Sequence, residues 1–275
     1  MIGYPSTALG ESAAAPAASG PDPAPASKMT IKAVTTCVRN ADFLAHTAPL
    51  NRQFFDRFVV VTAPEDKDTQ RVCKTWSIEC LATDVFRSHW GDFRKGAGIN
   101  KGLEALAIQP HDWLVHLDAD VILPGSFRHS LETAGLDPRM IYGVDRIEFK
   151  SYEQFQSWFG APTPLRDNMF VDTSHVAGAR IGTRIAFDHH QGYVPIGFFQ
   201  LWNAASGRLQ YPEGHSNAGR EDTLFGASWP RQQRGFIPEV IVYHLESEDA
   251  PMAVNWKGRV TKPFSIETAK NGPAA

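Results

Sequence analysis

The sequence predicts an α/β protein in which a mainly parallel sheet is flanked by helices. From residue 31 onward, short apolar runs alternate with segments of helical periodicity. Runs such as FVVVT and WLVHL are apolar almost throughout, which is typical of strands buried on both faces. Helices that connect such strands pack on the two faces of the sheet. Functional residues in this architecture lie beyond the carboxyl ends of the strands, so the polar residues that follow each run are the first candidates.

The individual elements follow from these patterns. Apolar runs predict strands over residues 31–38, 58–62, 77–82, 113–117, 140–144, 193–203 and 236–245. Helical patterns cover residues 42–55, 66–76, 93–107 and 221–229. We expect Pro49 to interrupt the first of these helices, Asp92 to cap the third and Pro230 to stop the last.

Composition narrows the class of protein. The chain has 275 residues, 43% of them hydrophobic, and a formal net charge of −3, so it can bury a large core and lacks a strongly basic character. Its three cysteines form no C-x-x-C pair, which favours a reducing compartment. No apolar run approaches the roughly 20 residues that span a bilayer. We expect a cytoplasmic protein, or one peripheral at a membrane surface.

The two ends of the chain differ in composition from the rest. Residues 1–28 are rich in Ala, Pro, Ser and Gly, which predicts a disordered leader. Residues 29–265 are expected to form a single continuous domain, and residues 266–275 a flexible tail.

The pair Asp118 and Asp120 follows the predicted strand 113–117 directly. Two carboxylates at this spacing can converge on a hard divalent cation such as Mg²⁺ or Mn²⁺ that also binds a diphosphate. The alternative is a solvated turn. A second D-x-D pattern, Asp66 and Asp68, does not follow a strand directly, and we interpret it as the first turn of a helix.

Three further segments are candidates for chemistry. Small residues at the start of the helix over 93–107, together with Lys95, suit a phosphate, although the same residues could simply allow close packing on the sheet. Glu221 and Asp222 begin a helix, where acids are favoured by the helix dipole and where one could act as a general base. His244 ends a strand and could add an imidazole to a metal site, whereas the other histidines, including His116, are interpreted as structural.

Taken in order, the segments FRKGAGINKGLEAL, DWLVHLDADVILP, GFFQLW, AGREDTLF and VYHL resemble GT-A-type glycosyltransferases with a Rossmann-like sheet. The resemblance covers residues 30 to 259 and is greatest to inverting enzymes similar to the β-galactosyltransferases and to glycosyltransferase family 2. It implies a nucleotide-sugar-binding half over residues 29–145 and an acceptor and catalytic half over residues 146–265.

The resemblance also implies roles for single residues. Asp120 would contact the metal, Asp118 the metal or the ribose, and His244 would be the distal metal ligand. Asp222 or Glu221 would be the catalytic base; because AGREDT differs from the Trp-Gly-rich acidic motif of the galactosyltransferases, either acid is open. The nucleotide-binding residues would be Thr36, Arg39, Glu65, Asp66, Lys95, Asn100 and Asp118. Those bordering the sugar or acceptor would be Gly197, Phe198, Trp202 and Trp229.

The expected activity is metal-dependent, inverting transfer from a nucleoside-diphosphate sugar, a UDP-sugar first of all, with Mn²⁺ or Mg²⁺. The acceptor is open among a glycan, a lipid-linked glycan, a protein and a modified nucleic-acid base, the last disfavoured by net charge. One alternative is a sugar-phosphate nucleotidyltransferase, although no glycine-rich loop follows the first strand. Another is a non-catalytic nucleotide- or carbohydrate-binding protein on the same fold.

Overall fold

The computed structural model describes residues 29–86, 94–149, 152–161, 193–213 and 218–245. The predicted leader, residues 1–28, the predicted tail, residues 266–275, and Asp92 lie outside the described residues. In the described part of the chain, no helix has the length and apolar character needed to cross a bilayer.

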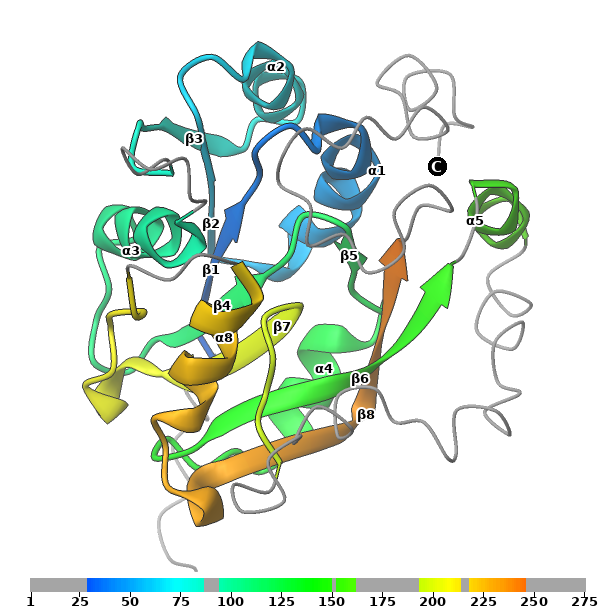
Figure 1. The fold of residues 1–275 in the computed structure, drawn as a ribbon. Helices are drawn as coiled ribbons and strands as arrows, with labels where there is room; N and C mark the ends of the chain where they lie inside the picture. Colours follow the sequence, from blue (N-terminus) through cyan, green and yellow to red (C-terminus); the bar gives the residue numbers. More distant parts are fainter. Residues whose placement is uncertain (1–28, 87–93, 150–151, 162–192, 214–217, 246–275) are drawn as a thin grey trace, which may run out of the picture.

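The core of the fold is an eight-stranded mixed sheet with the order β3-β2-β1-β4-β7-β6-β8-β5 (Figure 1). Its strands are β1 (Ile31–Thr36), β2 (Arg57–Thr62), β3 (Glu79–Ala82), β4 (Trp113–Leu117), β5 (Val121–Ile122), β6 (Ile141–Phe149), β7 (Phe199–Asn203) and β8 (Arg234–Leu245). Neighbours among β1 to β4 pair in parallel, as do β6 and β8, whereas β4–β7, β6–β7 and β5–β8 are antiparallel. The predicted parallel sheet is therefore confirmed in the first half of the chain, and the second half adds antiparallel pairs.

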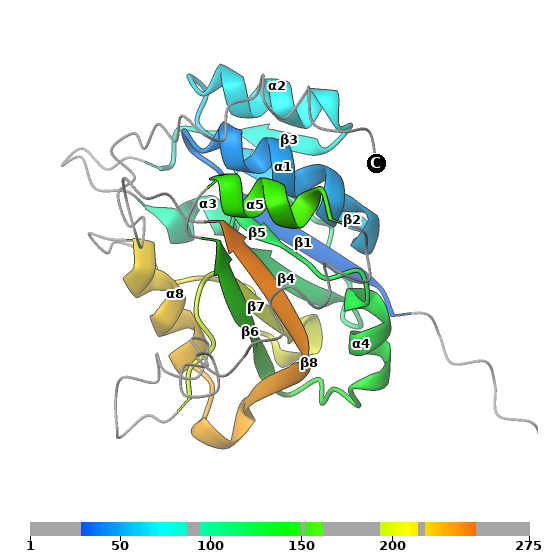
Figure 2. The ribbon, with the colours of Figure 1, turned by 90° about the vertical axis from the view of Figure 1, so that its right-hand side faces the viewer.

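Helices cover both faces of the sheet (Figures 1 and 2). They are α1 (Ala41–Asn51), α2 (Lys67–Thr75), α3 (Lys95–Ala105), α4 (Phe127–Thr133), α5 (Tyr152–Phe159) and α8 (Ala218–Ala227). Alternation along β2 shows the division: Val60 packs in the core with α1, α2 and α4, whereas Val59 and Val61 pack in the core with α3 and α8. Helix α5 packs with the ends of β6 and β8 in a third cluster that contains Phe149 and Trp158.

Several predicted boundaries are wrong. Helix α1 continues through Pro49 and ends two residues later, because Leu44, Ala45 and Ala48 bury its apolar side against the sheet. Helix α3 begins at Lys95 with Arg94 in the N-cap position. The strand predicted over 193–203 is regular only from Phe199 onward, and β6 extends to Phe149.

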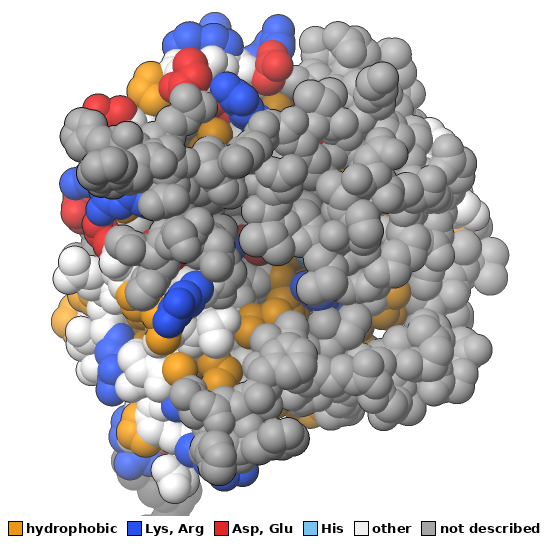
Figure 3. All heavy atoms as spheres, viewed as in Figure 1, with side chains coloured by type: hydrophobic (Ala, Val, Ile, Leu, Met, Phe, Trp, Pro, Cys, Tyr) orange, Lys and Arg blue, Asp and Glu red, His pale blue; other side chains and the backbone are white. Residues whose placement is uncertain are grey.

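On the face seen in Figure 3, acidic and basic side chains alternate along the upper and left edges of the described surface, over α2, β3 and α3. Asp68 with Arg71 and Lys101 with Glu104 are exposed ion pairs of this kind. The described surface there carries both signs of charge, in keeping with the small net charge of the chain.

The predicted helix start at Asp66 is confirmed. Its carboxylate accepts the Thr69 amide at 3.1 Å as the N-cap of α2 and also accepts the Thr69 hydroxyl and the Thr62 hydroxyl. It further accepts the backbone amide of Arg39, whose φ of 60° turns the chain after β1. One buried carboxylate thus joins the ends of β1 and β2 to the start of α2.

We predict that Asp66→Ala lowers the free energy of unfolding by about 2–4 kcal/mol, because the cap and several buried donors lose their acceptor. Asp68→Ala is the matched control, since Asp68 lies two residues away with 62% of its side chain exposed. Urea unfolding of both variants is the measurement. Equal midpoints for the two variants would contradict the structural role given to Asp66.

Candidate active site

The acidic pair lies where strands from both halves of the chain meet. The Asp118 amide donates to the Phe198 carbonyl at 3.2 Å, immediately before β7. The Asp120 carbonyl accepts the Leu245 amide at 2.8 Å, at the end of β8. The pair therefore sits beyond the carboxyl end of β4, where sites in α/β sheets occur.

A buried lysine lies between two carboxylates in this region. Lys95 Nζ is 2.6 Å from Asp118 Oδ1 and 2.8 Å from Asp222 Oδ2. Helices α3 and α8, which carry Lys95 and Asp222, lie side by side (Figure 1). Burial lowers the pKa of Lys95, but Asp118 and Asp222 raise it by more, so that the net pKa is above its ordinary value and the ammonium stays charged. Lys95, whose ammonium was predicted to bind the diphosphate, thus forms ion pairs with two carboxylates of the protein.

The two adjacent acids of α8 have different partners. Glu221 Oε2 accepts the Gly96 amide at 2.5 Å, so this fully buried side chain satisfies a free N–H in the first turn of α3. A methyl group at Gly96 would lie 3.3 Å from the same carboxylate, which shows how closely the two helix starts approach. Glu221 is therefore committed to joining α3 and α8.

Asp222 is buried, and its two carboxylate oxygens differ in their hydrogen bonding. Its Oδ2 accepts from Lys95, whereas Oδ1 has no hydrogen-bond partner among the described residues. Burial raises the pKa of Asp222, Lys95 opposes the rise and Asp118 adds to it, which brings the pKa to about 7. A carboxylate with this pKa and a free oxygen can take a proton near neutral pH, as a general base does.

Asp120 and His244 form a second pair of polar side chains, two residues along the chain from Asp118 on the aspartate side. His244 Nε2 lies 3.5 Å from Asp120 Oδ1, and the register of β5 and β8 pairs Val121 with His244. An oxygen and an imidazole nitrogen this close can both bind one ion, because Mg²⁺–ligand distances are about 2.1 Å. Within the described ranges, no three His, Cys, Asp or Glu side chains gather as a complete metal site. Two of the three predicted ligands fit a cation, and Asp118 is held by Lys95 instead.

A buried polar cluster, which the sequence patterns did not single out as part of a site, adjoins Asp118. His116 Nε2 is 3.6 Å from Asp118 Oδ1, and its ring meets the Tyr211 ring edge to face. Burial, followed by the Lys95 charge, holds the pKa of His116 well below its usual range, so the imidazole is neutral. The Tyr211 hydroxyl donates to Gln200 Oε1 at 2.5 Å. The place of His116 in an apolar strand was a signal, but it fits a structural histidine equally well.

Three of the other predicted nucleotide residues lie at the same edge of the sheet. Thr36 ends β1, and Glu65 and Asp66 follow β2. Asn100 holds the segment after β7, because its side chain donates to the Tyr211 carbonyl and accepts the Tyr211 amide. Thus the Asp66 and Asn100 side chains are bound to the protein itself.

Two residues predicted to border the sugar or acceptor, Trp202 and Trp229, are core side chains in the structure. Trp202 and Trp229 are 0% and 1% exposed and both pack edge to face against Phe225. The Arg208 guanidinium also lies 4.7 Å from the centre of the Trp229 ring. Phe198 is also buried, with the Arg146 guanidinium 4.8 Å from its ring centre, whereas Gly197 lies directly against Asp222.

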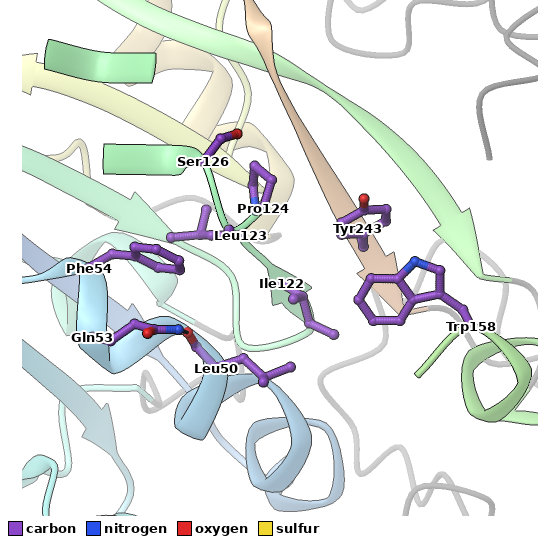
Figure 4. A pocket seen from close by; sticks show the side chains of 10 residues that line it. Leu50, Gln53, Phe54, Ile122, Leu123, Pro124, Ser126, Trp158 and Tyr243 are labelled. Carbon is purple, nitrogen blue, oxygen red and sulfur yellow. Dashed lines mark hydrogen bonds between the residues drawn. The ribbon is translucent and has the colours of Figure 1, made fainter. Parts of the chain in front are cut away.

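A separate cavity of about 450 Å³ lies behind the strand pair β5–β8 (Figure 4). Ile122 and Tyr243, which pair across these strands, line it together with Trp158 and Phe54. His244 is adjacent to Tyr243 and points to the opposite face of the strand. The cavity therefore contains none of the predicted metal or base residues.

Comparison with known proteins gives structural matches only. No family model matches the chain, and a search of curated proteins gives no match. Mannosyl-3-phosphoglycerate synthase from Rubrobacter xylanophilus matches with a TM-score of 0.41 and 13% identity over 79% of this chain and 67% of that chain. Glucosyl-3-phosphoglycerate synthase from Mycobacterium tuberculosis, in complex with Mn²⁺, UDP and glucosyl-3-phosphoglycerate, matches with a TM-score of 0.41 and 12% identity over 78% and 72%. The bifunctional glycosyltransferase WbbM matches with a TM-score of 0.43 and 10% identity over 78% and 40%.

We predict that Lys95→Met lowers the free energy of unfolding by about 3–5 kcal/mol at pH 8, because it leaves the buried carboxylate of Asp222 and the partly buried carboxylate of Asp118 without their cation. The loss is smaller at pH 5, where the raised pKa of Asp222 lets that carboxyl take up a proton. Lys101→Met, an exposed change on the same helix, is the control and should leave the unfolding midpoint unchanged. A Lys95→Met protein as stable as the control at pH 8 would contradict the role of Lys95.

Proposed function

We propose that this protein is a metal-dependent inverting glycosyltransferase that moves a sugar from a nucleoside-diphosphate sugar, a UDP-sugar first of all, to an acceptor hydroxyl or amine. The observation that carries the proposal is the Asp222 carboxylate. It is buried, one oxygen is fixed by Lys95, the other has no partner in the described part of the chain, and its pKa is about 7. The same lysine also contacts Asp118, which belongs to the aspartate pair at the end of β4.

In the proposed reaction, the acceptor oxygen or nitrogen attacks the anomeric carbon, and Asp222 Oδ1 takes the proton from that acceptor atom. The bond from this carbon to the diphosphate oxygen breaks, and the diphosphate leaves with the electron pair. Attack from the face opposite the leaving group inverts the configuration, and no bond to the enzyme forms. Lys95 keeps Oδ2 in place, so the proton-accepting oxygen is presented in one orientation.

The donor is proposed to bind at the aspartate pair. Asp120 and His244 would hold Mn²⁺ or Mg²⁺, whose charge would stabilise the departing diphosphate. Asp118, with 27% of its side chain exposed and one oxygen on Lys95, is proposed to accept a hydrogen bond from the ribose. Glu221 is not proposed as the base, because its carboxylate joins α3 to α8.

We predict that a panel of nucleotide sugars, incubated with Mn²⁺ and candidate acceptors, gives release of nucleoside diphosphate with at least one donor. The acceptors are a glycan, a lipid-linked glycan, a protein and a modified nucleic-acid base. Chelation should abolish the release, and Asp120→Ala and His244→Ala should lose Mn²⁺-dependent donor binding. Full activity after complete metal removal would contradict the role given to Asp120 and His244.

We predict that Asp222→Asn keeps donor affinity but lowers the transfer rate by about 10²–10⁴-fold, because the amide cannot take the acceptor proton. The matched control is Glu221→Gln, whose amide oxygen can still accept the Gly96 amide; transfer should continue at a rate close to that of the wild type. Donor binding by calorimetry and transfer by product formation separate the two effects. If Asp222→Asn transferred sugar at the wild-type rate, Asp222 would not be the base.

A further inference from the structure

A glycine stands where any side chain would collide with the proposed base. A Cβ atom built at Gly197 would lie 1.7 Å from Asp222 Oδ2 and 2.1 Å from Asp222 Cγ. Such separations are far inside van der Waals contact. The backbone of Gly197 is not in the left-handed region, which among the described glycines is adopted by Gly135 and Gly207. Space, rather than backbone conformation, is therefore what requires a glycine here.

The segment that carries Gly197 is fixed to α8 by one buried amide. Gln200 Nε2 donates to the Pro195 carbonyl at 2.8 Å and to the Asp222 carbonyl at 2.9 Å. Gln200 is fully buried in β7, and its Oε1 accepts the Tyr211 hydroxyl. The same side chain thus holds the backbone on both sides of the contact between Gly197 and Asp222.

A second close approach lies one helical turn further along α8. A Cβ atom at Gly226 would be 2.4 Å from the Pro195 carbonyl oxygen. Residues 222 and 226 share one face of the helix, since they are four positions apart. Helix α8 therefore lies close against the segment before β7 at two points, Asp222 and Gly226.

We propose that Gly197 is a positioning residue for Asp222: its missing side chain lets the carboxylate place Oδ2 on Lys95 and leaves Oδ1 as the atom that receives the acceptor proton. The catalytic meaning of this proposal rests on the proposed function. The steric relation between the two residues does not. Gly197 itself touches the base and contributes no reacting group.

The first test is Gly197→Ala. The added methyl group forces the Asp222 carboxylate out of its position, so kcat should fall by about 100-fold, the cost of a misplacement of about 1 Å. The KM for the donor and the affinity for UDP should stay within about threefold. The control is Gly125→Ala, because a Cβ there meets nothing within 4 Å, and its kcat should equal that of the wild type.

The second test is a double-mutant cycle on stability, which does not depend on activity. Gly197→Ala is introduced into the wild type and into Asp222→Ala, which lacks Cγ and both oxygens and leaves only Cβ, 2.7 Å from the new methyl group. The shift of the urea midpoint caused by Gly197→Ala should be clearly smaller in the Asp222→Ala background. Equal shifts in the two backgrounds would overturn the proposal.

The outcomes separate this inference from the proposed function. If Gly197→Ala transferred sugar at the wild-type rate while Asp222→Asn did not, the positioning role would be wrong and the base would stand. If the wild type transferred no sugar from any donor, the proposed function would fail, and the stability cycle would still decide whether Gly197 makes room for Asp222.

Discussion

The site depends on the two ion pairs that the Lys95 ammonium makes with Asp118 and Asp222. Lys95 lies between Asp118 of the strand end and Asp222 of α8, at 2.6 and 2.8 Å, with 8% of its side chain exposed. Without such a cation, the repulsion between two adjacent carboxylates, one buried and one partly buried, would disfavour the ionised form of both. The lysine therefore holds Asp118, which is proposed to bind the donor, next to Asp222, the proposed base.

The rest of the structure places that lysine. Helix α3 begins at Lys95, and its next residue, Gly96, donates its amide to Glu221, so that the starts of α3 and α8 are joined by a carboxylate. Gln200 in β7 holds the backbone of Asp222 from the other side. Each contact connects parts of the chain that are distant in sequence, so the site depends on tertiary packing.

Local patterns predicted much of the fold because its first strands are continuous apolar runs and α2 begins at a capping acid, Asp66. Strand β5 has only two residues, which is too short to give a pattern. The position of an acid after a strand indicated Asp118, and a helix start indicated Asp222. Their common partner Lys95 could not be predicted in that role, because Lys95 and Asp222 are 127 residues apart and meet only through packing.

The most direct test of this account is the ¹³C chemical shift of the Asp222 carboxyl carbon followed against pH, with Asp222→Asn used to assign the signal. We expect a titration midpoint near pH 7, because burial raises the pKa of Asp222 by more than the charge of Lys95 lowers it. A midpoint near pH 4, the ordinary value for an exposed aspartate, would contradict it.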